Sequence, residues 1–151
     1  GIFFTQDQAQ VAVNYKNEHP KMISEVSIFK KYDAGDFIIQ VSGRADGVEG
    51  LCIRDAKTKF SPPSATEYYN SYQWRFYLDM FQLPVFYYDL FEVTNYTGIY
   101  NDRIPGVVIV PYEPFECLAY DRMAEDVHQL VLDFAQYIRI KNFTHLLKQV
   151  A

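Results

Sequence analysis

The chain has 151 residues, 49% of them hydrophobic and 17% aromatic, and its 14 Lys and Arg against 19 Asp and Glu give a formal charge of -5. This length suffices to bury one substantial core, so we expect a single domain over residues 1–151. The negative balance excludes a broad positive surface that would attract a polyanion. Any nucleic-acid binding must therefore be local or assisted by metal ions.

Cysteine content and hydropathy bear on the cellular setting. The two cysteines, Cys52 and Cys117, are too few for a disulfide framework or for a four-cysteine zinc or iron–sulfur site. No apolar run approaches the roughly 18 residues needed to cross a bilayer, and the N-terminus lacks the basic and apolar segments of a secretory signal. We therefore expect a soluble cytoplasmic protein that does not bind membranes.

The first part of the chain is predicted to form a helix followed by an antiparallel meander of three strands. Apolar positions at helical spacing indicate a helix from Thr5 to about Glu18, closed by Pro20. Turn-forming clusters then separate short runs of strand-forming residues. The expected strands are 25–32, 37–45 and 51–59, and the expected turns are 33–36 and 47–50.

The second part is predicted to form two helices around two further strands. Aromatic and apolar residues at three- and four-residue steps indicate a central helix over 65–81, after the helix-incompatible Pro62 and Pro63. Strands are expected over 85–94 and 106–112, and an amphipathic helix from Leu118 to about Ile140. The segment 95–105 is expected to be a mobile loop.

The predicted third strand changes character along its length. Alternation places Ile53, Asp55 and Lys57 on one face, so that face turns from apolar to charged. Asp55 and Lys57 could simply form a neutralising ion pair. Alternatively, Asp55 could hold a divalent cation with a second acid while Lys57 positions a water molecule. Asp46 is the obvious second acid. Straight pairing about the 47–50 turn would set it nearer to Cys52 or Ile53 than to Asp55, so twist or a bulge would have to bring the acids together.

These residues resemble a known set. The series Asp46…Asp55-Ala56-Lys57 resembles the D…(D/E)-x-K signature of the PD-(D/E)XK nuclease superfamily. The surrounding Gly-Arg-Ala-Asp-Gly and the Thr after the lysine resemble its RecB-like exonuclease branch, as does a Gln-x-x-x-Tyr motif at Gln73 and Tyr77 on the predicted central helix. The resemblance implies an α/β, restriction-endonuclease-like αβββαβ core with a central mixed β-sheet flanked by helices.

The resemblance also implies roles for these residues. Asp46 and Asp55 would bind Mg2+ or Mn2+ together with the backbone carbonyl of Ala56, and Lys57 would orient the attacking water. The Gln-x-x-x-Tyr pair would support the site or contact the DNA backbone. Many members of this branch carry an upstream metal-binding histidine, for which His19 is the candidate here.

Weaker candidates surround this set. Glu18 and Glu25 are alternative third ligands. Basic residues close to the motifs in sequence could supply local phosphate contacts, despite the negative total. They are Arg44, Arg54, Lys59 and Arg75, of which Arg44, Lys59 and Arg75 are the expected substrate contacts.

The resulting expectation is a Mg2+- or Mn2+-dependent deoxyribonuclease, a RecB-like exonuclease acting in DNA repair, recombination or phage DNA processing. Its partner is DNA; a homo-oligomer and a helicase or recombination partner stay open. The alternative is a catalytically inactive nuclease-fold module that binds nucleic acid or protein.

Overall fold

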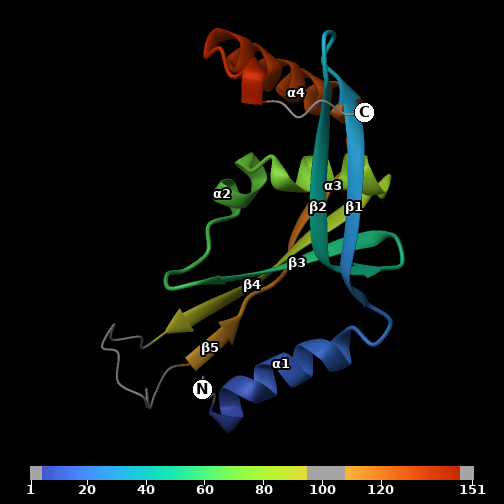
Figure 1. Cartoon of the computed structure of the whole chain (residues 1–151). Helices are drawn as coiled ribbons and strands as arrows, with labels where there is room; N and C mark the ends of the chain where they lie inside the picture. Colours follow the sequence, from blue (N-terminus) through green and yellow to red (C-terminus); the bar gives the residue numbers. More distant parts are fainter. Residues whose placement is uncertain (1–4, 95–107, 147–151) are drawn as a thin grey trace.

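A six-stranded mixed sheet forms the centre of the molecule (Figure 1). The computed structural model describes residues 5–94 and 108–146. The strands run in the order β1-β2-β3-β4-β5, and β6 also pairs with β4; among these described strands, only the β3–β4 pairing is parallel. Their bounds are β1 Ile23–Asp33, β2 Ile38–Glu49, β3 Cys52–Lys59, β4 Val85–Thr94, β5 Val108–Pro111 and β6 Phe115–Leu118.

Helices lie on both faces of this sheet (Figure 1). Helix α1 (Gln6–Glu18) covers one face, and α2 (Ala65–Asn70) and α3 (Gln73–Phe81) cover the other, while α4 (Met123–Ile140) is followed by a short 3-10 turn at Thr144–Leu146. The expected α/β class with a central mixed sheet and flanking helices is confirmed, and the order from α1 to β4 is αβββααβ, with two short helices where the expected αβββαβ series has one. In the described ranges, no helix is both long and apolar enough to span a membrane.

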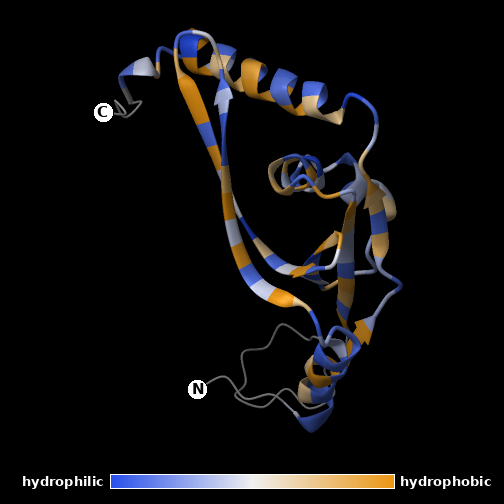
Figure 2. Cartoon of the chain, turned by 90° about the vertical axis from the view of Figure 1, so that its right-hand side faces the viewer, coloured by the Kyte–Doolittle hydropathy of each residue, from blue (hydrophilic) through white to orange (hydrophobic). Residues whose placement is uncertain are grey.

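The buried side chains form two clusters that hold the functional strands in place. The larger cluster joins β3, β4 and α3 through residues such as Ile53, Phe86 and Trp74. The smaller one joins the long β1–β2 hairpin to α4 through Tyr32, Val127 and Val131. Figure 2 shows this hairpin curving away from the sheet toward α4, with hydrophobic and hydrophilic residues alternating along it.

The second turn of the meander differs from the prediction. Strand β2 continues through the expected 47–50 turn to Glu49, which pairs with Cys52 and leaves only Gly50 and Leu51 as the turn. Gly50 has φ +58°, the left-handed conformation that a tight hairpin requires and glycine tolerates. The prediction was wrong because Gly47, taken as a turn residue, is buried under Met22 within the strand.

The expected single helix over 65–81 is broken into α2 and α3. At the junction Ser71 has extended dihedral angles (φ -67°, ψ 138°), and its Oγ accepts a hydrogen bond from the backbone N–H of Gln73. The Arg75 guanidinium bonds the carbonyl oxygens of Tyr69 and Ser71, and Trp74 Nε1 also donates to that of Tyr69. These side chains satisfy the carbonyls that a continuous helix would have used.

The last helix begins later than expected. It was predicted from Leu118, but residues 115–118 pair with β4 as the unpredicted strand β6, and the helix starts at Met123. The register Phe86↔Cys117 places the buried Cys117 side chain in the main core. Pairing with β4 therefore takes Leu118 out of the predicted helix. The loop expected over 95–105 lies outside the described residues.

Candidate functional site

The two acids of the motif meet where β2 and β3 separate. Paired residues end at Gly47↔Arg54, and the next residue of each strand is Asp46 and Asp55. The Asp46 carboxylate accepts a hydrogen bond from the backbone N–H of Ala56 (Oδ2 to N, 2.9 Å). The Asp46 side chain thus accepts the hydrogen bond that a backbone carbonyl would accept in a regular antiparallel ladder. The two acids are adjacent because the turn is two residues long, and no bulge is needed.

Asp55 is the buried centre of the site. Its side chain faces α3 and is part of a residue only 3% exposed. Lys57 Nζ lies 2.6 Å from Asp55 Oδ2, and Gln73 Nε2 donates to Asp55 Oδ1 at 3.1 Å. Burial raises the pKa of Asp55, the Lys57 ammonium opposes that shift, and the nearby Asp46 carboxylate adds to it. The protein groups around Asp55 therefore offset only part of the cost of burying its charged form.

Tyr77, on α3, contacts β2 just before Asp46. Its hydroxyl donates to the backbone carbonyl of Arg44 at 2.8 Å, and its ring meets that of Phe86 edge to face. A Cβ at Gly43 would lie 3.1 Å from the Tyr77 ring, so the absence of a side chain there leaves room for Tyr77. Since Gln73 and Tyr77 lie one helical turn apart, α3 presents both toward β2 and β3. We call Asp46, Asp55, Lys57, Gln73 and Tyr77 the acid–lysine site.

His19, the expected upstream ligand, is not joined to this site. Its Nδ1 lies 2.8 Å from Glu49 Oε2, and the same carboxylate oxygen lies 3.7 Å from Arg54 Nε. Arg54 and Asp55 are consecutive in a strand and point to opposite faces of the sheet. Within residues 5–94 and 108–146, no group of three or more His, Cys, Asp or Glu side chains is placed to hold a metal ion.

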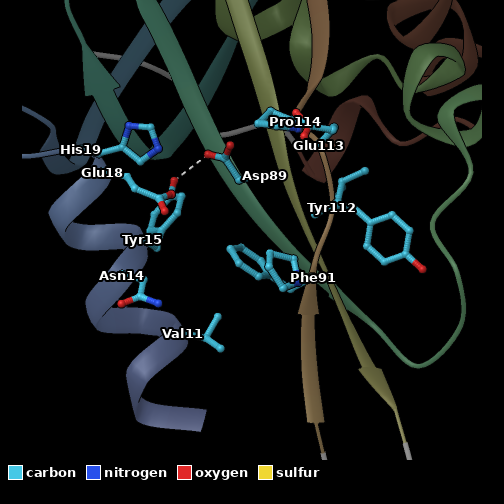
Figure 3. A pocket seen from close by; sticks show the side chains of 12 residues that line it. Val11, Asn14, Tyr15, Glu18, His19, Asp89, Phe91, Tyr112, Glu113 and Pro114 are labelled. Atoms are coloured by element: carbon cyan, nitrogen blue, oxygen red, sulfur yellow. Dashed lines mark hydrogen bonds between the residues drawn. The ribbon is translucent and has the colours of Figure 1, made fainter. Parts of the chain in front are cut away.

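His19 instead borders a cavity between α1 and the sheet (Figure 3). The cavity has a volume of about 340 Å3, and residues of α1 face those of β4 and the segment after β5 across it. At its floor, Asp89 accepts hydrogen bonds from Tyr15 Oη at 2.6 Å and Arg54 Nη1 at 2.5 Å. Burial and the bond to Asp89 raise the pKa of Tyr15 well above its usual range. This buried acid is therefore fully partnered and ties α1 to the back of β3.

The three basic residues expected to bind substrate have different surroundings. Arg75 is committed to the α2–α3 junction, where it also stacks on the Trp74 ring at 4.2 Å. Lys59 forms an ion pair with Glu67. Arg44 is exposed beside the site, with its carbonyl bonded to Tyr77. Arg44 and Lys59 remain candidates for phosphate contacts, whereas Arg75 has a structural role.

The two weaker acid candidates lie apart from Asp55. Glu18 lines the cavity under α1. Glu25 is exposed in β1, and the pairs Ser24↔Gly47 and Val26↔Ala45 set its backbone opposite Asp46. Glu25 has φ +57°, a conformation that costs energy for a residue other than glycine. The backbone opposite the first acid is therefore distorted.

Sequence reasoning missed Tyr88, which contacts the site from β4. The parallel register Asp55↔Tyr88 sets it beside the buried acid, and its side chain is fully buried. The Tyr87-Tyr88-Asp89 run had been read only as a strand. Alternation could have shown that Tyr88 and Asp89 point to opposite faces, but not which face carries the site.

Comparisons with known proteins leave the family open. No protein-family model and no curated protein matches the sequence. Among solved structures, one described as the crystal structure of SSO0001 superposes with a TM-score of 0.48 at 20% identity. The match covers 80% of this chain and 55% of that one, so the chain spans about half the length of that protein. At this TM-score the likeness carries no argument about activity.

Proposed function

We propose that this chain is a divalent-cation-dependent nuclease that hydrolyses DNA phosphodiester bonds at the acid–lysine site. The observation that carries the proposal is the convergence of Asp46, Asp55 and Lys57 at one end of the β2–β3 ladder. Gln73 and Tyr77 of α3 approach the same point. Their arrangement agrees with the resemblance to RecB-like nucleases, from which the preference for DNA and an exonuclease mode are inferred.

The donor atoms at this site suit Mg2+ or Mn2+. Asp55 Oδ2 is buried and has the Lys57 ammonium beside it, and Asp46 supplies a second, exposed carboxylate. Mg2+ is commonly held by one or two carboxylates, with water completing its coordination. Two carboxylates therefore fit such an ion without His19. The carbonyl of Ala56 is a third candidate oxygen ligand.

The residues of the site divide the chemistry between them. A bound divalent cation would lower the pKa of a water molecule and stabilise negative charge on the phosphoryl oxygens. Lys57 is about one-third exposed, so its ammonium can leave Asp55 and hold the attacking water or the developing charge. Gln73 keeps the Asp55 carboxylate oriented through its amide. Tyr77 anchors β2 through the Arg44 carbonyl and keeps Asp46 beside β3.

The test is cleavage of linear single- and double-stranded DNA with Mg2+ or Mn2+, comparing the parent with Lys57→Ala. Loss of one electrostatic contact to a transition state costs on the order of a hundredfold in rate, and we expect at least that loss. Lys31→Ala is the matched control, because Lys31 is an exposed lysine on the distant hairpin. Intact DNA with the parent protein at stoichiometric amounts, or full activity of Lys57→Ala, would refute the proposal.

A non-catalytic nuclease-fold module is the second candidate. One observation favours it: His19 is bonded to Glu49 and does not complete a three-residue ligand set with the two acids. Such a module would bind DNA or a protein without binding Mn2+. Calorimetric titration of the parent with Mn2+ separates the candidates, since heat that disappears in Asp55→Asn supports the nuclease.

A further inference from the structure

A second cavity opens beside the acid–lysine site, between the end of β3 and the α2–α3 junction. Its volume is about 300 Å3, and its walls include Lys57 and Gln73, so it shares two residues with the site. A water molecule occupies about 30 Å3 in the liquid, so the space holds about ten waters and has ample room for a phosphate group. The cavity is therefore continuous with the place where chemistry would occur.

Most polar groups in its walls donate hydrogen bonds. Two ammonium groups come from Lys57 and Lys59, which point to the same face of β3. Ser71 and Gln73, at the amino end of α3, contribute a hydroxyl and an amide. Glu67, the acid in the lining, is paired with Lys59. The two ammonium groups are each paired with one acid, Lys57 with Asp55 and Lys59 with Glu67, so the cavity is distinguished by its hydrogen-bond donors and not by a net positive charge.

Tyr88 supplies the observation that points to a ligand. The residue is 0% exposed, it lines this cavity, and its hydroxyl donates no hydrogen bond among the described residues. Burial raises the pKa of Tyr88 to about 12, while the Ser71 hydroxyl and the backbone of Trp74 oppose that shift as donors toward the Tyr88 oxygen, so it is the Tyr88 O–H itself that lacks an acceptor among the described residues. Leaving a buried hydroxyl without a partner costs about 1–3 kcal/mol. A ligand oxygen in the cavity would remove that cost.

We infer that this cavity is a phosphate-binding subsite, in which Tyr88, Ser71 and Lys59 hold a phosphate group next to the one cleaved at the acid–lysine site. A phosphate accepts several hydrogen bonds and carries negative charge, which matches the donor walls. In taking that phosphate to belong to a nucleic-acid strand, the inference rests on the proposed function. Phosphate would compete with the Glu67 carboxylate, which forms an ion pair with Lys59 when no phosphate is bound.

Direct binding without divalent cations tests the subsite. Inorganic phosphate, the dinucleotide TpT and its 5′-phosphorylated form pTpT are titrated into the protein in the presence of a chelator, with calorimetry or NMR as the readout. We expect phosphate to bind, and Tyr88→Phe to weaken it about tenfold, since a hydrogen bond to a charged group is worth at least that factor. Glu67→Gln should tighten binding several-fold by freeing Lys59. A preference for pTpT over TpT would assign the subsite to a terminal phosphate, and equal binding to an internal one.

Tyr87→Phe is the matched control, because Tyr87 is the preceding residue of β4, points to the opposite face and donates to Glu116. It should leave phosphate binding unchanged. Thermal unfolding adds a second readout: Tyr88→Phe should be at least as stable as the parent, since the Tyr88 O–H has no acceptor to lose. Absence of phosphate binding, unaltered binding in Tyr88→Phe, or marked destabilisation of Tyr88→Phe would each overturn the inference.

The two proposals fail in different ways. If the parent cleaves DNA with Mn2+ but phosphate binding does not depend on Tyr88, the subsite is wrong and the nuclease stands. If phosphate binding depends on Tyr88 while DNA remains intact with every cation, the nuclease is wrong and the cavity is the anion site of a binding module.

Discussion

Replacing Asp55 with asparagine should separate stability from function at the acid–lysine site. Because burial raises its pKa, the folded protein binds a proton at Asp55 more readily than the unfolded chain does. The cost of the buried charge is absent below the ordinary pKa of Asp, about 3.9, and develops as pH rises through the raised value. Asparagine avoids this cost and keeps an oxygen that can accept from Gln73.

The magnitude follows from these contacts. Substitutions that stabilise a natural protein commonly contribute about 0.5–2 kcal/mol each, and we take that range for removal of the buried charge. The lost ion pair offsets little of this, because Lys57 can return to solvent. At a size of 150–250 residues, 1 kcal/mol shifts Tm by roughly 2–4 °C. We therefore expect Asp55→Asn to melt a few degrees above the parent near neutral pH without metal, and the difference to vanish near pH 3.

With divalent cations present, the parent should instead melt at a higher temperature than Asp55→Asn. An ion at a hundred times its Kd stabilises the folded state by about 2.7 kcal/mol, which raises the Tm of the parent by roughly 5–11 °C. Asp55→Asn should gain little. The assay is thermal unfolding with and without Mn2+, and Asp133→Asn, an exposed acid on α4, should respond like the parent. A metal-free Asp55→Asn that melts below the parent, or equal gains from Mn2+ in both proteins, would refute the reasoning.

Two further predictions concern the β1–β2 hairpin and the end of β2. The Tyr32 hydroxyl donates to the buried Asp79 carboxylate at 2.6 Å. Tyr32→Phe should therefore lower the free energy of unfolding, measured by urea titration, by about 1.5–3 kcal/mol. A loss indistinguishable from zero would contradict this role of the hydroxyl. A Cβ at Gly47 would lie 2.1 Å from Met22 Sδ, so Gly47→Ala should cost about 1–3 kcal/mol. Adding Met22→Ala should recover part of that loss by relieving the clash, and a double variant no more stable than Gly47→Ala would count against it.

The elements that the sequence predicted well are those with strong local signals. Helix α1 begins after Thr5, whose side chain forms a reciprocal cap with Gln8, and ends before Pro20. The first turn lies where Asp33 and Gly35 occur together, and Asp33 Oδ1 accepts from the Gly35 N–H. Capping and turn chemistry act within a few residues, so they can be read from the sequence alone.

The elements that were mispredicted depend on distant partners. Residues 115–118 were not predicted as a strand but pair with β4. The continuous helix predicted over 65–81 is broken by contacts of Arg75 and Trp74 with the carbonyl of Tyr69. Periodicity reports which side of a segment is apolar. It does not report what covers that side, and here the sheet edge and the junction contacts decided the structure.

The candidate site was likewise predicted in part from the sequence and decided in part by tertiary contacts. The order Asp46, Asp55, Lys57, Gln73, Tyr77 is a property of the sequence, and alternation already placed Asp55 and Lys57 on one face of a strand. Whether Asp46 reaches that face depended on a register difference of two residues, which the Gly50-Leu51 turn determined. The separation of His19 from the acids and the unpartnered Tyr88 hydroxyl arise from packing across the sheet. Only the tertiary structure decides such contacts, because they join residues that no local pattern links.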